Sequence, residues 1–255
     1  MTAPRRQAPL TVLHPEPHHC NDFVRRQALG RVPLFADLDA GALAAIDARS
    51  TVSSRDGGEL VHRRGQPAER VFIPVHGAVK LVRATPKGEE VLVDIVGRGE
   101  VLGGLPALGD EVYAETARAI TPVCLLSLDS ASFEWVLRTY PQVARTALKL
   151  VGGRLNRAHS ALERLAATAE QRVASALLAL AERLGVERDD ALLIDVPLSR
   201  EDLASLAGCA PETASRVLAR LRREGLVDSG RRWVAIRDLD GLRGLALTGS
   251  EPTRP

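Results

Sequence analysis

The stretch from Leu198 to Arg223 constrains the chain most, because it predicts two helices joined by a tight turn. Ser199, followed three residues later by Asp202, is typical of a capping box at a helix start. Gly208 predicts the end of that helix, since glycine adopts the left-handed conformation at little cost. Pro211 suits the first turn of the next helix, where the N–H that proline lacks would have no intrahelical acceptor. Small and apolar side chains at helical spacing predict that the two helices pack together as a helix-turn-helix; these are Leu203, Ala204, Leu206, Ala207, Ala214, Val217, Leu218 and Leu221.

The second helix of this motif carries polar side chains on one face. Glu212, Ser215 and Arg216 share that face. Arginine can donate two hydrogen bonds to guanine, and a carboxylate can accept from cytosine. From residue 211 to residue 237 there are seven arginines and three acids, a net charge of +4. The alternative is an exposed ion pair on a solvated helix, worth a few tenths of a kcal/mol. Turn, caps and charge together favour double-stranded DNA as the ligand.

The sequence LSREDLASLAGCAPETASRVLARLRREGLV, followed by GRRWVAIRDL, resembles the DNA-binding end of the Crp/Fnr family of bacterial transcription regulators. The pattern E-T-x-S-R is closer to the Fnr branch than to the cyclic-AMP branch. The resemblance implies that Glu212, Ser215 and Arg216 read bases and that RNA polymerase is a partner. Ala210 stands where members usually carry a Ser or Thr cap.

A winged helix-turn-helix domain is predicted over residues 168–247. An amphipathic helix at 168–184 opens it, and a hairpin wing around Ser229-Gly230 follows the second helix. The wing carries two of the side chains expected to hold the DNA backbone. The predicted backbone contacts are Ser199, Arg220, Arg222, Arg231 and Arg232.

Residues 23–136 are predicted to form a sensor domain. A short helix with Leu38, Leu43 and Ile46 facing inward comes first. Four alternating segments punctuated by glycines follow it, namely GELVHRRG, RVFIPVHGAVKLVRA, EEVLVDIVGRGEVLGG and AETARAITPVCLLSLD. This pattern predicts a small antiparallel barrel or jelly roll. Its glycine spacing resembles the family's cyclic-nucleotide-binding-like β-roll, with residues 97–104 at the pocket loop.

The pocket of that roll departs from the pattern that the resemblance implies for cyclic AMP. Members that bind cyclic AMP place a Glu after the last motif glycine and an Arg-Ser pair nine or ten residues later. Here Gly104 and Tyr113-Ala114 take those places. A buried phosphate without a cationic partner is heavily penalised, and the alternation around Arg118 predicts that it points outward. We therefore expect no cyclic AMP, and the effector or cofactor stays unknown.

The helix predicted over residues 137–167 carries an apolar seam at heptad spacing. A core-facing helix with coincidental phase is the alternative. A two-fold DNA site requires a two-fold protein, so we expect a parallel homodimer on a palindromic TTGA-like or TGTGA-like site. The predicted interface residues are Leu148, Val151, Leu155, Ala158, Leu162 and Leu165.

No metal centre is expected. The Fnr branch can hold an iron–sulfur cluster on four cysteines, but Cys20 and Cys124 are the only candidates before the DNA-binding domain. His14, His18, His19 and Cys20 are attributed to chance clustering rather than a metal site. His62 and His76 are interpreted as surface or strand-end residues rather than haem ligands.

The remaining sequence features indicate the cellular compartment of the protein. Three scattered cysteines predict no disulfide framework, in keeping with a reducing cytoplasm. No apolar run approaches the roughly 18 residues that span a bilayer, and the start lacks the apolar core of an export signal. Residues 1–22 and 248–255 are expected to be a flexible tail and a disordered tail. Thiol oxidation at Cys20 or Cys124 stays open as a means of control.

The predicted fold class is therefore α+β, with an antiparallel β-roll, a long dimerisation helix and a winged helix-turn-helix. The predicted function is sequence-specific transcription regulation. A ligand-binding module that acts on a protein partner is the alternative, and the ordered basic helix counts against it. The chain contains no Ser/His/acid elbow, P-loop, dinucleotide fingerprint or HExxH motif, so an enzyme is not expected. Activation or repression and the target genes are left open.

Overall fold

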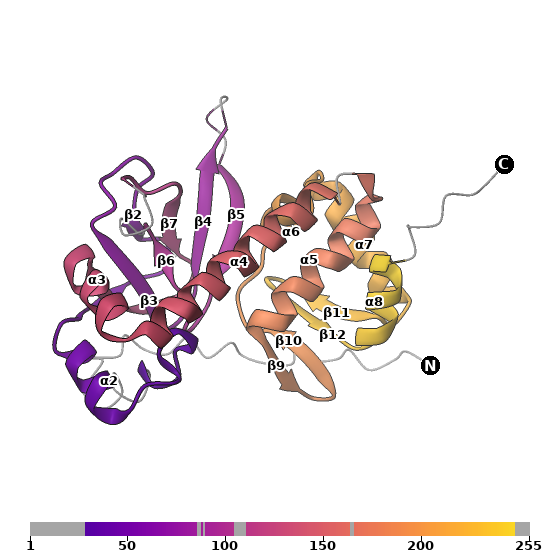
Figure 1. The fold of residues 1–255 in the computed structure, drawn as a ribbon. Helices are drawn as coiled ribbons and strands as arrows, with labels where there is room; N and C mark the ends of the chain where they lie inside the picture. The colour runs from indigo at the N-terminus through magenta and orange to yellow at the C-terminus, as the bar shows by residue number, and fades with distance from the viewer. Residues whose placement is uncertain (1–28, 86–87, 89, 105–110, 164–165, 248–255) are drawn as a thin grey trace. The chain divides into compact units, whose positions relative to one another are not determined.

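The computed structural model describes residues 29–85, 88, 90–104, 111–163 and 166–247. The predicted tails, 1–22 and 248–255, lie outside the described residues. The cluster of His14, His18, His19 and Cys20 belongs to the first of these tails. The described chain divides into two compact units, which separate between Ala161 and Leu162. Each unit is an α+β fold in its own right (Figure 1).

The first unit is a roll of two antiparallel sheets, each with four strands. The first sheet has the order β1-β8-β3-β6, with β1 at Thr51–Arg55, β8 at Val123–Asp129, β3 at Arg70–His76 and β6 at Leu102–Gly103. The second has the order β2-β7-β4-β5, with β2 at Leu60–His62, β7 at Thr116–Ala119, β4 at Val79–Ala84 and β5 at Glu90–Val96. The predicted β-roll is confirmed, although β1 was not predicted, because its polar residues show little alternation.

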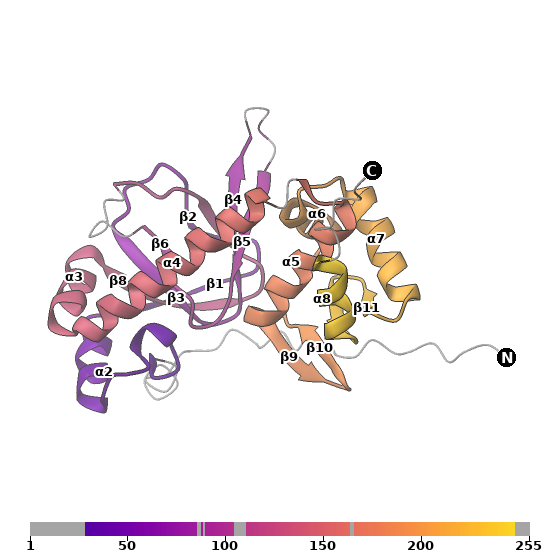
Figure 2. The ribbon, with the colours of Figure 1, turned by 45° about the vertical axis from the view of Figure 1, so that its right-hand side comes forward.

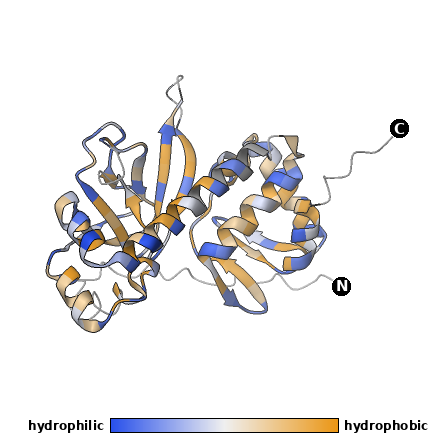
Figure 3. Cartoon of the chain, viewed as in Figure 1, coloured by the Kyte–Doolittle hydropathy of each residue, from blue (hydrophilic) through white to orange (hydrophobic). Residues whose placement is uncertain are grey.

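Apolar residues from both sheets form the core of the roll. Phe72, Leu102 and Leu125 come from the first sheet, while Val79 and Ala117 come from the second. Because successive residues of a strand point to opposite faces, the intervening residues of β3 and β8 are left for another layer. Figure 3 shows apolar residues along the strands of the roll, among them β3, β4 and β5.

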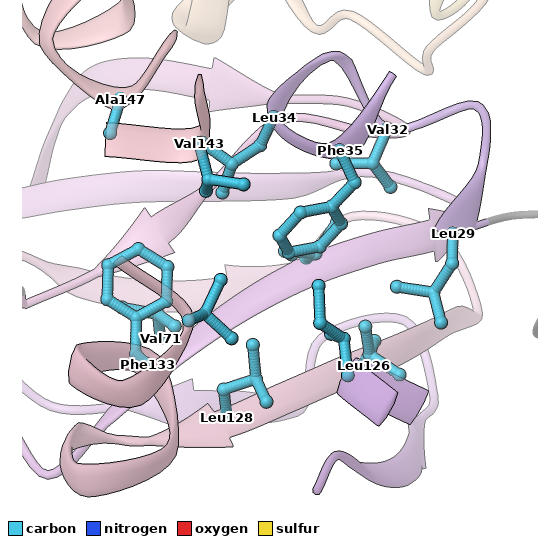
Figure 4. Close-up of a cluster of buried hydrophobic side chains, with 13 residues drawn as sticks. Leu29, Val32, Leu34, Phe35, Val71, Leu126, Leu128, Phe133, Val143 and Ala147 are labelled. Carbon is cyan, nitrogen blue, oxygen red and sulfur yellow. The ribbon is translucent and has the colours of Figure 1, made fainter. Parts of the chain in front are cut away.

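That other layer is helical and covers the outer face of the first sheet. It consists of a 3-10 turn at Pro33–Phe35, α2 at Ala40–Asp47, α3 at Ser130–Thr139 and the first turns of α4, which spans Pro141–Glu163. Figure 4 shows Phe35 and Leu126 facing each other in this cluster, and Ile46 is fully buried in it. Leu38 and Leu43 are partly buried against the same cluster, as expected.

The long helix α4 crosses the strands of the roll in both ribbon views (Figures 1 and 2). Val143 and Ala147 bury themselves in the helical layer. Further along, the seam positions are exposed, with relative exposures of 64% at Leu148, 39% at Val151 and 55% at Leu155. Ala158 and Leu162 lie within α4, and Leu165 lies outside the described residues.

The second unit begins with α5 at Ala169–Leu184, which Thr168 and Gln171 start with a capping box. Then follow β9 at Gly185–Arg188, β10 at Ala191–Ile194, α6 at Arg200–Ala207, α7 at Pro211–Arg223, β11 at Val227–Gly230, β12 at Trp233–Ile236 and α8 at Leu239–Leu247. The four strands form one antiparallel sheet in the order β11-β12-β10-β9. The predicted winged helix-turn-helix is confirmed, while β9, β10 and α8 were not foreseen.

Candidate nucleic-acid interface

The start and end of α6 follow the predicted capping chemistry. The Ser199 hydroxyl accepts from the Asp202 backbone N–H at 3.0 Å, and the Asp202 carboxylate accepts from the Ser199 N–H at 3.1 Å. The same hydroxyl also donates to the Asp202 carboxylate at 2.7 Å. Gly208 ends the helix in the left-handed conformation, with φ of 59°. The predicted DNA contact of Ser199 therefore involves a hydroxyl that already caps a helix.

Helix α7 buries its apolar side and presents the predicted reading face. Ala214, Leu218 and Leu221 are buried. Glu212 and Arg216 are exposed, and the Ser215 side chain beside them is half-buried. The Arg216 guanidinium donates to the Thr213 hydroxyl at 3.3 Å. Among the described residues neither Glu212 nor Arg216 forms an ion pair, so the exposed i,i+4 pair considered above is absent and both charged groups are available to a ligand.

Two of the predicted backbone contacts lie in the turn of the wing. Gly230 pairs with Trp233 across the hairpin, which makes Arg231 and Arg232 the two turn residues. The turn is therefore two residues later than predicted. Gly230 belongs to the strand rather than to the turn, and a glycine is present there because of the Trp233 ring. A Cβ at Gly230 would lie 2.2 Å from the Trp233 indole nitrogen, so only glycine admits the ring. Arg232 has φ of 64°, and both turn arginines are exposed.

The wing is attached to its domain by an arginine that the sequence analysis did not single out. The Arg237 Nε donates to the Asp228 carboxylate at 2.7 Å, and its Nη1 donates to the Asp189 carbonyl at 2.5 Å. Arg200 adds a bond of 3.3 Å from its guanidinium to the Gly230 carbonyl. The turn arginines thus project from a hairpin that these bonds fix to the rest of the unit.

Arg220 and Arg222, also predicted backbone contacts, differ in their surroundings. Arg222 is exposed at the last turn of α7. Arg220 pairs with Glu170 at 2.9 Å and with Glu224 at 2.7 Å. The Glu224 hydrogen bond is the main cause that raises the pKa of Arg220. With two carboxylates already beside it, Arg220 is better placed to hold α7 against α5 than to neutralise a phosphate.

A second arginine missed by the sequence analysis is Arg172, in the first turn of α5. Its Nε donates to the Ala207 carbonyl at 2.8 Å, its Nη1 to Ala167 at 2.6 Å and its Nη2 to Gly208 at 3.3 Å. The available signal was a charged residue between the buried positions Gln171 and Val173. Cysteine 209 follows in the turn as a free thiol, and burial raises its pKa.

The roll pocket places Tyr113 where the resemblance implies an arginine. Tyr113 is 5% exposed. Its hydroxyl donates to the Arg70 carbonyl at 3.1 Å and accepts from the Arg70 backbone N–H at 3.1 Å. Burial is the main cause that raises its pKa, so the phenol stays neutral. Arg118 points away from the core, as predicted, because its guanidinium donates to the Gly58 carbonyl at 2.9 Å while Ala117 is fully buried.

His62 was expected to be a surface or strand-end residue, and it is a strand-end residue with a buried side chain. His62 ends β2 as foreseen, but its side chain is 6% exposed and its ring stacks on Tyr113 at a centroid distance of 3.9 Å. The residue opposite it on β7 is Ala117, whose small side chain leaves room for the ring. Among the described residues neither ring nitrogen has a hydrogen-bond partner of normal geometry. Burial lowers the pKa of His62 from 6.5 to about 4, and a backbone group of Glu115 acts in the opposite direction.

Cysteine 124 is disulfide-bonded, although the scattered cysteines predicted no disulfide framework. Its side chain is 5% exposed beside Val75. Counting scattered cysteines cannot show which of them the fold brings within bonding distance. In the described part of the chain, no three His, Cys, Asp or Glu side chains gather as a metal site. No helix there is both long and apolar enough to cross a membrane.

Comparisons with known proteins agree with this arrangement. The sequence model of the Crp-like helix-turn-helix domain matches residues 171–245, and that of the cyclic nucleotide-binding domain matches residues 54–140. The global nitrogen regulator of Synechococcus elongatus is 31% identical over 199 residues, which cover 76% of this chain and 86% of the relative. The chain belongs to the Crp/Fnr family of transcription regulators. Its members are DNA-binding regulators and not enzymes.

Two further Crp/Fnr proteins show the range of likeness. The CRP-like cAMP-activated global transcriptional regulator of Mycobacterium tuberculosis is 29% identical and covers 85% of this chain and 97% of its own length. The structure of FixK2 from Bradyrhizobium japonicum superposes with a TM-score of 0.68 at 28% identity, over 77% of this chain and 96% of that chain. The Crp/Fnr architecture therefore extends over both units.

Proposed function

We propose that this Crp/Fnr protein acts in the cytoplasm as a homodimer on a palindromic, TTGA-like or TGTGA-like DNA site without cyclic AMP, and that it works with RNA polymerase. Glu212, Ser215 and Arg216 read bases in each half-site, while Arg222, Arg231 and Arg232 hold the backbone. Ser199 and Arg220 have a smaller share in backbone binding, because one caps α6 and the other pairs with two carboxylates.

The observation that carries the dimer is the exposed apolar seam of α4. Leu148, Val151 and Leu155 follow one another at spacings of three and four, and all three are exposed in the single chain. Apolar side chains at this spacing form the contact between two parallel helices of a coiled coil. A second copy of α4 is the occupant with matching spacing and chemistry, and it supplies the two-fold axis that a palindrome requires.

The proposed independence from cyclic AMP is supported by the contents of the roll. The position where the resemblance implies a phosphate-binding arginine holds Tyr113, which is buried and neutral. Its hydroxyl is already hydrogen-bonded to the backbone N–H and carbonyl of Arg70. The ring of His62 stacks on that tyrosine, and at neutral pH this histidine carries no charge. A buried cyclic phosphate would therefore lack a cationic partner and would have to displace a stacked pair.

The test of the proposed dimer uses matched leucine substitutions on α4. Leu155→Arg places a charge in the seam, whereas Leu150→Arg places the same charge on an exposed position off the seam, where Leu150 is 36% exposed. Desolvating an unpaired arginine in an apolar seam costs several kcal/mol. We expect Leu155→Arg to sediment as a monomer and to bind an operator selected from random DNA feebly, while Leu150→Arg stays dimeric and keeps its affinity.

Two results would contradict the proposal. Wild-type protein that selects no DNA sequence from a random pool would refute sequence-specific binding. A Leu155→Arg variant that remains a dimer with normal operator affinity would place the interface elsewhere. Circular dichroism and thermal unfolding of both variants check that each unit remains folded.

A further inference from the structure

We infer that Arg172, on α5, is a positioning residue for DNA recognition, because it fixes the turn from which α7 extends. This inference rests on the proposed reading role of α7. It adds that the orientation of the reading face depends on a side chain that lies outside the helix-turn-helix and does not touch DNA.

The geometry of Arg172 is that of a clamp on backbone carbonyls. Its guanidinium donates to Ala207, the last residue of α6, and to Gly208, which caps that helix in the left-handed conformation. The third donor bonds Ala167, at the entrance to α5. The last carbonyls of a helix have no partner within it, so Arg172 satisfies two groups that the chain itself leaves open.

These two carbonyls control the direction of α7. Only residues 208 to 210 separate α6 from Pro211, the first residue of α7. The backbone N–H of Cys209 bonds back to Ala204 at 3.0 Å, which leaves the peptide planes around Gly208 as the main freedom of the turn. A small rotation there moves Glu212 and Arg216 together, and binding groups must be held within about 0.5 Å of their productive geometry.

A direct phosphate contact explains Arg172 less well. Each of its three nitrogens already donates to a carbonyl, and its side chain is half-buried. A second link supports the positioning role of the same helical turn. Glu170, two residues earlier, pairs with Arg220 of α7 at 2.9 Å. The first turn of α5 thus contacts both the turn before α7 and the body of α7.

The experiment compares Arg172→Ala and Arg172→Lys with Arg243→Ala as a matched control. Arg243 lies on α8 of the same unit, and its ion pair is with Asp240, three residues away, at 3.2 Å. Fluorescence anisotropy measures binding of each protein to the selected operator and to a scrambled duplex over a range of salt concentrations. Hydrogen exchange follows the backbone amides of Cys209 and Ala214, which report on the turn and on the first bond of α7.

We expect Arg172→Ala to lose roughly tenfold or more in operator affinity, as for one hydrogen bond to a charged group. Its scrambled-duplex affinity and salt slope should equal those of Arg243→Ala, because neither residue touches phosphate. Arg172→Lys keeps the charge but cannot span both carbonyls, so it should lose specificity partially. Faster exchange at Cys209 and Ala214 should accompany the loss in both Arg172 variants.

Two results would overturn the inference. One is an operator preference in the Arg172 variants equal to that of a sequence-specific wild type. The other is an equal loss on both duplexes with a salt slope lower by about one, which identifies a phosphate contact instead. A wild type without sequence preference would refute the proposed function itself, so the two failures are distinguishable. If Arg172→Ala unfolds, the Lys variant and its exchange rates decide the question.

Discussion

Lowering the pH should destabilise the roll through His62. This imidazole is 6% exposed, its ring stacks on Tyr113, and burial lowers its pKa from 6.5 to about 4. Between these two pH values the unfolded chain binds a proton at this site that the folded chain does not. The free energy of unfolding therefore decreases as the pH falls. The stabilisation is complete above pH 6.5 and is lost progressively down to about pH 4.

The magnitude follows from the two pKa values. The difference between 6.5 and about 4 corresponds to about 3 kcal/mol of unfolding free energy. This is a large share of the 5–15 kcal/mol by which a typical domain is stable. The size of this effect follows from the surroundings of the imidazole, which Phe72 and Tyr113 flank. Neither ring nitrogen has a hydrogen-bond partner among the described residues, and the opposing effect of the Glu115 backbone is smaller than that of burial.

The assay is urea unfolding between pH 4 and pH 7.5, with His62→Phe as the reference protein. Phenylalanine keeps a ring against Tyr113 but has no proton to gain. Carboxylates elsewhere titrate in both proteins, so the difference in unfolding free energy isolates His62. We expect that difference to shift by about 3 kcal/mol in favour of the phenylalanine variant on going from pH 7 to pH 4. A difference that does not change with pH would refute the buried, neutral histidine.

Two further predictions concern DNA and cyclic AMP. Arg216→Ala should cost about 1–3 kcal/mol of binding free energy on the operator and little on a random duplex. Arg222→Ala should weaken binding to both duplexes alike and reduce the salt slope by about one. Anisotropy titrations on the two duplexes distinguish these outcomes, and an equal loss on both duplexes for Arg216→Ala would contradict base reading. Calorimetric titration of the protein with cyclic AMP should give no saturable heat, and the affinity for the operator should not change when the nucleotide is added. Micromolar binding of cyclic AMP together with tighter operator binding would contradict the proposed independence from cyclic AMP.

The helix-turn-helix could be predicted from the sequence because its signals are local. The capping box of Ser199 and Asp202, the left-handed Gly208 and Pro211 at the start of α7 each act within a few residues. Local signals of this kind need no knowledge of what packs where. The same holds for most of the roll, whose alternating segments and glycines match β2 to β8 in type and order.

What could not be predicted depends on partners that are distant in the sequence. His62 is buried because it pairs across the sheet with Ala117 and stacks on Tyr113, about fifty residues away. Arg172 lies 35 residues from the carbonyl of Ala207 to which it donates. Neither neighbour is visible in the sequence around these residues, so the burial of His62 was not predicted and Arg172 was not identified as a candidate.

Three of the missed secondary elements, β9, β10 and α8, belong to the second unit and were missed for local reasons. The hairpin of β9 and β10 turns at Asp189 and Asp190, both with positive φ, where glycine or asparagine is the usual signal. Helix α8 contains Gly241 and Gly244, which lower helix propensity. The packing at Gly241 is nevertheless close, because a Cβ there would lie 2.4 Å from the Asp238 carboxylate and 2.7 Å from the Leu226 side chain, which would both have to shift. Packing decided these elements against the intrinsic preference of their residues.

The contacts within the second unit bear on how a Crp/Fnr protein can bind DNA without a nucleotide. A ligand can shift a conformational equilibrium only by its differential affinity for the two states. Here the turn before α7 is held by Arg172, and α7 itself is held by the pair of Arg220 with Glu170. These contacts are made within one unit, so they orient the reading face without any contribution from a molecule bound in the roll. With His62 stacked on Tyr113 at the position where the family resemblance implies a phosphate-binding arginine, such local contacts are the arrangement that the proposed nucleotide-independent recognition requires.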